Sequence, residues 1–137
     1  MLAQARSQLP KLVPVLDAAA VWAALRRTGL PVWYMKTDTQ GYDYAIVRRM
    51  VDGAGGGKLD VGVLKSEVNG VNAEVYAGVH NDVRLWKALI ARIGFARASG
   101  TPVDVFYKDE GDQCWYNTDP KWTALINETQ RARYCRS

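Results

Sequence analysis

The sequence predicts an α/β fold in which a parallel sheet ends in an antiparallel hairpin. Apolar runs typical of strands alternate along the chain with amphipathic segments typical of helices. The apolar run of residues 59–68 is nearly continuous, as expected for a strand buried on both faces of a parallel sheet. Residues 95–110 read as two short strands around a glycine, which is typical of a hairpin. The length of 137 residues suits a single domain.

The first part of the chain predicts one helix between two extended segments. Residues 11–16 read as a short strand or an extended lead-in. Asp17 suits the N-cap of a helix over residues 18–28, and Gly29 suits its end. Residues 32–35 are then predicted to form a strand, because this β-prone run is too short for a helix.

A second helix is predicted over residues 42–52, after a turn at Gly41. Asp43 lies in its first turn, where a negative charge is favourable. The residues spaced for one buried face are Tyr42, Ile46 and Met50. The glycine-rich run of residues 53–57 follows, before the strand of residues 59–68. Its spacing is shorter than that of a phosphate-binding loop and it follows a helix instead of a strand, so we interpret it as a flexible connection.

The most regular helical pattern covers residues 81–94. Asn81 or Asp82 caps its start and Gly94 ends it. Its expected buried stripe consists of Trp86, Leu89, Ile90 and Ile93. In the predicted hairpin that follows, the alternating residues are Val103, Val105 and Tyr107. Residues 113–122 indicate an irregular or short-strand tail.

Composition and charge exclude several classes of function. The net charge is only +4 and the arginines are scattered, so we expect no nucleic-acid partner. No apolar run approaches the ~20 residues of a membrane span, and the first residues lack the apolar core of a signal peptide. We therefore expect no membrane partner and a cytoplasmic location. The glycosylation triplet at Asn127 is accordingly interpreted as a chance match.

The cysteines and the histidine are too few to predict a metal site. The chain has two cysteines, Cys114 and Cys135, and one histidine, His80, whereas a structural zinc ion usually takes about four such ligands. The wide cysteine spacing favours two buried or incidental thiols over a disulfide. Catalysis by a Ser–His or Cys–His pair would have to use His80, and no nucleophile motif is present.

Two acids follow successive predicted strands. Asp38 and Glu67 would both reach the crevice at the carboxyl edge of a parallel sheet, where open sheets bind ligands. Alternatively, each acid caps the next helix or solvates a loop. Lys36 shares a strand face with Tyr34 and Asp38 because side chains two apart point the same way. A lysine in a buried strand needs an acid partner, and Asp38 or Glu67 would supply it. Such a pair is either structural or part of an active site.

The same residues resemble the FkbM-type methyltransferases, which use S-adenosylmethionine. The stretch YMKTDTQGYDYAIV (residues 34–47) resembles the Lys-x-Asp-x-x-Gly signature of that family. LKSEV (residues 64–68) resembles the next strand of the family, and VPVLDAAAVWAAL (residues 13–25) resembles the segment and helix before the signature. Residues 76–95 and 109–119 resemble the tail of a eukaryotic, algal-type branch.

This resemblance implies the second half of a Rossmann-like class I methyltransferase sheet. Asp38 and Glu67 would be acceptor-side catalytic acids and Lys36 their charge partner, while Gln40 and Gly41 would contact the S-adenosylmethionine cofactor in the turn. The implied acceptor is a hydroxyl group on a small molecule or a glycan. Further candidates for the rim of the crevice are His80, Asn81 and Asp82.

The resemblance covers the half of the fold that does not hold most of the methyl donor. We expect a single partial domain over residues 1–137, with a core at about 12–119 and a polar, frayed tail at 120–137. It would be a truncated product, a fragment of a gene, or a piece that needs a partner. The alternative is a non-catalytic α/β interaction module. In either case the strand beginning at Val32 would lose a neighbour and become a sheet edge, unless residues 11–16 fold back to cover it. Through such an edge we expect self-association.

Overall fold

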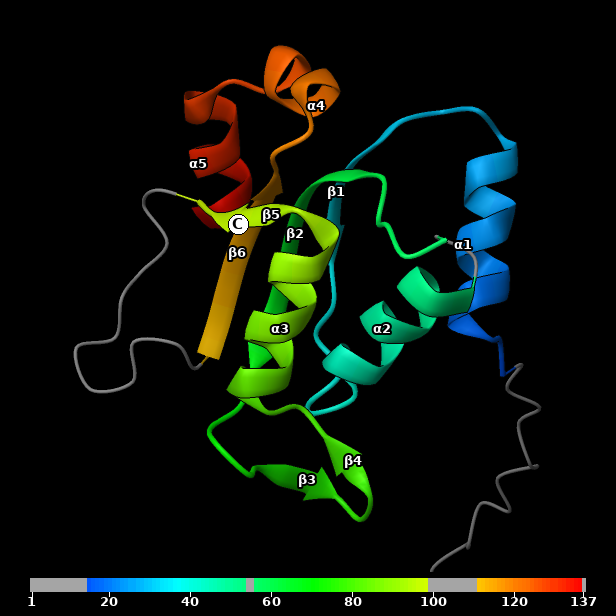
Figure 1. Ribbon diagram of the computed structural model, residues 1–137, viewed down its shortest axis with the longest axis vertical. Helices are drawn as coiled ribbons and strands as arrows, with labels where there is room; N and C mark the ends of the chain where they lie inside the picture. The colour runs from blue at the N-terminus through cyan, green and yellow to red at the C-terminus, as the bar shows by residue number, and fades with distance from the viewer. Residues whose placement is uncertain (1–14, 54–55, 99–110, 137) are drawn as a thin grey trace, which may run out of the picture.

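The computed structural model describes residues 15–53, 56–98 and 111–136. In chain order the elements are α1 (Ala18–Arg27), β1 (Val32–Lys36), α2 (Asp43–Gly53), β2 (Val61–Val68), β3 (Glu74–Tyr76), β4 (Val79–His80), α3 (Val83–Ile93), β5 (Phe95–Arg97), β6 (Gly111–Asn117), α4 (Pro120–Leu125) and α5 (Glu128–Arg136). Figure 1 shows a central sheet with helices packed around it and the small β3–β4 hairpin projecting from one end.

The main sheet has the strand order β1-β2-β6-β5. β1 and β2 are parallel, with Tyr34 opposite Val63 and Lys36 opposite Lys65. β6 lies antiparallel between β2 and β5. The predicted α/β class, with parallel strands followed by an antiparallel end, is therefore confirmed. The predicted alternation at Val103, Val105 and Tyr107 lies outside the described residues.

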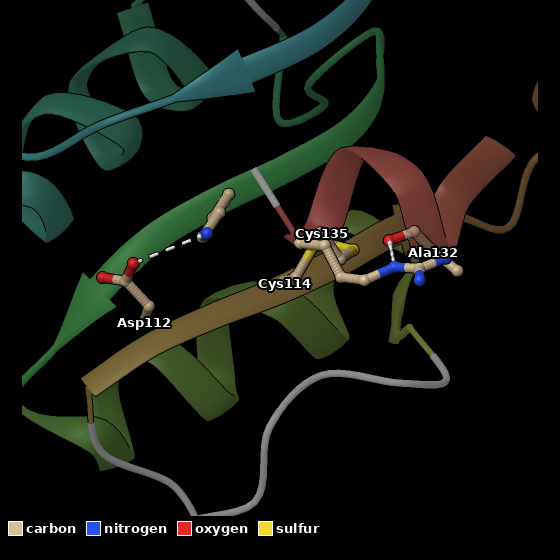
Figure 2. Close-up of a disulfide and its surroundings, with 6 residues drawn as sticks. Asp112, Cys114, Ala132 and Cys135 are labelled. Atoms are coloured by element: carbon tan, nitrogen blue, oxygen red, sulfur yellow. Dashed lines mark hydrogen bonds and ion pairs between the residues drawn. A yellow bond between two sulfur atoms is a disulfide. The ribbon is translucent and has the colours of Figure 1, made fainter.

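Helices cover both faces of this sheet. α2 and α3 lie on one face and α5 on the other, as the two views together show (Figures 1 and 2). β2 contributes to both cores: Leu64 packs in the α2–α3 core and Val63 packs in the core with Trp122 and Cys135. Seven of the eight β2 residues are buried, so the prediction that this strand is buried on both faces is confirmed.

The helix caps follow the local sequence signals. The Asp17 carboxylate accepts the backbone N–H of Ala19 at 2.7 Å, at the start of α1. Asp82, instead of Asn81, caps α3 and accepts the N–H of Arg84 at 2.7 Å. Gly94 ends α3 with a left-handed φ of 74°, a conformation that glycine adopts at little cost. Both helices begin and end close to where the sequence predicts.

The predicted buried face of α2 is wrong by one residue. Tyr42 is exposed and lies against Tyr76, with ring centroids 5.0 Å apart. The fully buried positions are Asp43, Val47 and Val51. Burial of Asp43 turns the helix, because its carboxylate accepts hydrogen bonds from the loop before it. A polar residue therefore occupies the inward stripe, where a hydrophobicity pattern does not look for it.

The carboxyl-terminal region also differs from the prediction. Of the two alternatives for residues 113–122, the strand is the one that forms: β6 covers Gly111–Asn117, and α4 begins at Pro120. The region expected to fray forms α4 and α5, which bury Trp122, Ile126 and Cys135. A disulfide joins Cys114 of β6 to Cys135 of α5, with Cα atoms 5.6 Å apart (Figure 2). The predictions of free thiols and of a frayed tail are wrong, because packing of α5 on the sheet brings two distant cysteines together.

The glycine-rich run connects α2 to β2, as the sequence predicts. Gly56 and Gly57 have positive φ angles in the loop between α2 and β2. None of the helices in the described part of the chain has the length and apolar character needed to cross a membrane.

Candidate functional site at the carboxyl edge of the sheet

The loop after β1 is held in place by hydrogen bonds on both sides. The N–H of Thr37 donates to the carbonyl of Lys65 at 3.0 Å, which extends the pairing of β1 with β2. The Thr37 hydroxyl lies 2.7 Å from the Ser66 hydroxyl, and both residues are buried. Buried Asp43 accepts from the N–H and the hydroxyl of Thr39. Asp38 is thus carried on a short, fixed piece of backbone between these anchors.

Asp38 is the acid that pairs with Lys36. The Lys36 Nζ and the Asp38 Oδ2 are 3.2 Å apart, which confirms that the two side chains share one side of the chain. The Gln40 side-chain amide donates to Asp38 Oδ1 at 3.1 Å. These contacts, with Lys36 the stronger, lower the pKa of Asp38, and the hydrogen bond with Asp38 raises the pKa of Lys36. The lysine is less buried than its strand suggested, since its side chain is 36% exposed.

Like charges lie directly opposite each other on this face of the sheet. Lys36 of β1 is opposite Lys65 of β2, and Glu67 of β2 is opposite Asp112 of β6. Directly opposed side chains share a face, and like charges there repel. A diagonal ion pair offsets this repulsion, because Lys65 Nζ lies 3.5 Å from Asp112 Oδ2 (Figure 2).

Lys65 is the most enclosed charge of the group. Its side chain is only 10% exposed. It lies opposite Cys114 in the strand register, and Cys114 is bonded to Cys135 of α5. We call the set of Lys36, Asp38, Lys65, Glu67 and Asp112 the edge cluster.

Glu67 is the least satisfied member of the edge cluster. Its Oε2 atom is buried and has no hydrogen-bond partner among the described residues. Desolvation raises the pKa of Glu67, and the nearby carboxylates of Asp43, Asp38 and Asp112 raise it further. A carboxyl group whose charged form is disfavoured in this way is suited to holding and releasing a proton. The edge cluster therefore combines a proton-holding acid with a paired, ionised one.

The turn that follows Asp38 is shaped by a close contact. Gln40 and Gly41 both have positive φ, at 53° and 116°. A Cβ atom on Gly41 would lie 2.6 Å from the Cβ of Val75, so the space that glycine leaves is filled by the β3–β4 segment. This contact explains why glycine is needed there. A role for Gln40 and Gly41 in cofactor binding stays a prediction.

Asn81 has a structural role at the rim. It is fully buried, and its Oδ1 accepts from the N–H of Tyr44 at 3.0 Å and from the indole N–H of Trp86 at 2.8 Å. Its Nδ2 donates to the carbonyl of Glu67 and to the side chain of Asn69, each at 2.9 Å. One side chain therefore ties α2, α3 and the end of β2 together, which positions the backbone of Glu67.

The other two residues predicted at the rim, Asp82 and His80, lie outside the edge cluster. Asp82 is buried and pairs with Arg84 at 2.7 Å, and this contact lowers the pKa of Asp82. His80 is exposed. It lines a cavity of about 590 Å³ with Asn72, Glu74, Asp82, Arg84 and Leu85. Neither residue belongs to the edge cluster.

Lys65 and Asp112 were missed by sequence analysis. A signal for Lys65 was present, because a lysine inside the apolar run VLKSEV needs a buried partner as much as Lys36 does. No such signal existed for Asp112, since its position depends on β6 pairing with β2.

The edge cluster mixes enclosed and exposed charges, because the Lys65 side chain is 10% exposed and the Asp38 side chain 50% exposed. A large hollow lies at the opposite end of the sheet. That hollow has a volume of about 540 Å³ and is lined in part by Arg26, Lys58, Asp60 and Lys121, near the start of β2. Asp60 is already engaged there by Lys121 and by the Trp122 indole. Within the described ranges, no group of three or more His, Cys, Asp or Glu side chains is placed to hold a metal ion.

Comparison with known proteins gives no match to a protein family, to a curated protein or to a solved structure.

Proposed function

We propose that this chain is the acceptor-side half of an S-adenosylmethionine-dependent O-methyltransferase that resembles the FkbM type. The observation that carries the proposal is the position of Lys36–Asp38 and Glu67. Two adjacent parallel strands deliver them to the same edge of the sheet, as the resemblance implies. The antiparallel end formed by β6 and β5 also agrees with the expected second half of such a sheet.

The edge cluster offers separate roles for its two acids. Asp38 is exposed, and its paired lysine favours the ionised form, so it suits orienting an acceptor hydroxyl by accepting its hydrogen bond. Glu67 has a raised pKa and a free buried oxygen, so it suits accepting the proton that such a hydroxyl loses. Lys36 holds Asp38 in position.

The turn at Gly41 offers no open space for the nucleotide part of the methyl donor. The one strand-to-helix turn beside the edge cluster contains Gly41, and the space beside this glycine is occupied by Val75. It is therefore not an open glycine-rich cradle for a nucleotide. S-adenosylmethionine would supply an electrophilic methyl group, and we assign its binding to a part of the fold other than these residues.

A second candidate function is a non-catalytic interaction module with the same fold. The observation that favours it is the edge position of β1, which pairs only with β2 among the described strands. In the first candidate the edge cluster takes part in methyl transfer, whereas in the second its ion pairs have only a structural role.

Calorimetric titration of the chain with S-adenosylmethionine tests the assignment of the donor site. We expect weak binding at most, because Val75 fills the space beside Gly41 and the turn is not an open glycine-rich cradle. A dissociation constant in the low micromolar range, about −8 kcal/mol, would contradict this and would place a donor site within the chain.

Complementation tests the catalytic proposal. The chain is mixed with the amino-terminal half of an FkbM-type enzyme, and transfer of a labelled methyl group to a panel of small-molecule and glycan hydroxyls is measured. Labelled product that depends on both halves supports the acceptor-side role. A folded, associated pair without product favours the interaction module.

A further inference from the structure

The disulfide changes what is expected of the compartment in which this chain folds. Cys114 and Cys135 are both buried, and their bond joins β6 to α5 beside the edge cluster. Structural disulfides of this kind form and persist in oxidising environments and are rare in the cytosol. The expected cytoplasmic location took no account of this bond.

A second feature of the same helix is suited to such a compartment. Asn127, Glu128 and Thr129 match the acceptor triplet for N-linked glycans. All three are exposed: Asn127 precedes α5, and Glu128 and Thr129 are its first two residues. The triplet is thus on the surface of the fold, where a glycan would be tolerated.

The side chain of Asn127 presents its nitrogen for modification. Its Oδ1 accepts the N–H of Gln130 at 2.9 Å, and the Gln130 Oε1 accepts the N–H of Asn127 at 2.9 Å. This reciprocal pair caps the start of α5. The Nδ2 atom has no hydrogen-bond partner among the described residues. A glycan on Nδ2 would therefore leave the capping oxygen in place.

We propose that Asn127 is an N-glycosylation site and that the chain matures in a disulfide-forming compartment. In the transfer, Asn127 Nδ2 forms a bond to the anomeric carbon of a lipid-diphosphate-linked oligosaccharide. The bond from that carbon to the diphosphate oxygen breaks, the lipid diphosphate leaves with the electron pair, and the amide nitrogen gives up one proton to a base on the transferase. This proposal does not depend on the proposed methyltransferase function.

Asn127 and the edge cluster lie near opposite ends of α5. α5 has nine residues, a length of about 13 Å, and Asn127 precedes its first turn. Cys135 lies in its last turn and is bonded to Cys114, which is opposite Lys65 in the strand register. The attachment point and the edge cluster therefore lie near opposite ends of one helix.

The test uses the full chain behind a cleavable secretion signal in yeast. We expect the secreted protein to lose mass on treatment with peptide N-glycosidase, and Asn127→Gln and Thr129→Ala to show no such loss. Thr129→Ser is the matched control, because serine preserves the triplet, and it should keep the glycan. Alkylation under non-reducing conditions should find no free thiols in the secreted wild type.

Two results would overturn the proposal: a secreted, disulfide-bonded chain that carries no glycan, or a glycosylated chain whose cysteines are both reduced. A variant can fail to be exported from the cell. Glycosylation of Asn127 is therefore also measured in cell-free translation with endoplasmic-reticulum microsomes, where export is not required. Absence of a glycan on the wild type in that system likewise contradicts the proposal.

Discussion

At the scale of single residues, the ionised carboxylate of Glu67 destabilises the folded protein. Burial and three nearby acids raise its pKa, so the folded protein binds a proton more readily than the unfolded chain does. Stability therefore falls as the pH rises from the ordinary glutamate pKa of 4.5 through the raised folded value. Above both values the cost of the charge is fully present.

Glu67→Gln should remove that cost. We expect the variant to melt at a higher temperature than the wild type at neutral pH and to lose this advantage at low pH, where Glu67 is protonated in both states. Thermal melts across a pH series measure the effect. Glu74→Gln, an equivalent change at an exposed glutamate of β3, is the control. A Glu67→Gln variant less stable than wild type at neutral pH would show that the carboxylate is satisfied.

Asp38 should matter for chemistry and little for folding. Its carboxylate is half exposed and its ion pair with Lys36 is at the surface, where such pairs contribute at most about 1 kcal/mol. Asp38→Asn should therefore keep the free energy of unfolding within about 1 kcal/mol of wild type while abolishing methyl transfer in the complemented enzyme. Asp52→Asn, at another ion-paired surface aspartate, should leave transfer unchanged. Full activity in a stable Asp38→Asn variant would exclude the assigned role.

At the scale of elements, α5 depends on its covalent link to β6. The helix is strongly polar and its one buried residue is Cys135, so packing alone holds it weakly. The disulfide spans 21 residues, and closing a loop of that size contributes about 3 kcal/mol. The double variant Cys114→Ser, Cys135→Ser should lose roughly that amount.

Denaturant unfolding with and without reductant measures this contribution. Reductant should destabilise the wild type and have no effect on the double variant, and hydrogen exchange should show loss of protection in residues 128–136. Equal stability of the wild type in both conditions would mean that α5 is held by Tyr34–Tyr134 stacking and Ile126 burial instead.

At the scale of the whole molecule, the open edge at β1 should drive association. β1 pairs on one side only within the described sheet, and Trp33 is 37% exposed beside that edge. No proline or charge interrupts the strand before Lys36, so its unpaired N–H and C=O groups are free to recruit another strand. We expect the isolated chain to self-associate.

Size-exclusion chromatography with light scattering tests this expectation. Trp33→Lys places a charge on the edge and should shift the chain towards the monomer. Leu125→Lys changes an exposed apolar residue on α4 and should leave association unchanged. A wild-type monomer at tens of micromolar would mean that the edge is covered, and would favour the free-standing module over an incomplete enzyme.

The sequence alone determined the features that depend on neighbouring residues. The Asp17 cap, the stripe of α3, the buried run of β2 and the shared side of Lys36 and Asp38 all follow from spacing of a few positions, and the structure confirms each. The α/β class followed from the alternation of these elements, and the sheet is mixed, with β1 and β2 parallel and β6 antiparallel to β2 and β5.

Only the tertiary structure decided the features that join distant parts of the chain. The antiparallel insertion of β6 places Asp112 beside Lys65 and opposite Glu67, and the docking of α5 brings Cys135 to Cys114. Asp43 is a different case, because its partners Thr39 and Gly41 are only a few positions away: the buried carboxylate is satisfied by the preceding loop, which a pattern of apolar residues does not register. The periodicity of apolar residues does not indicate which distant segments pack together, so it could not predict the Lys65–Asp112 ion pair or the Cys114–Cys135 disulfide.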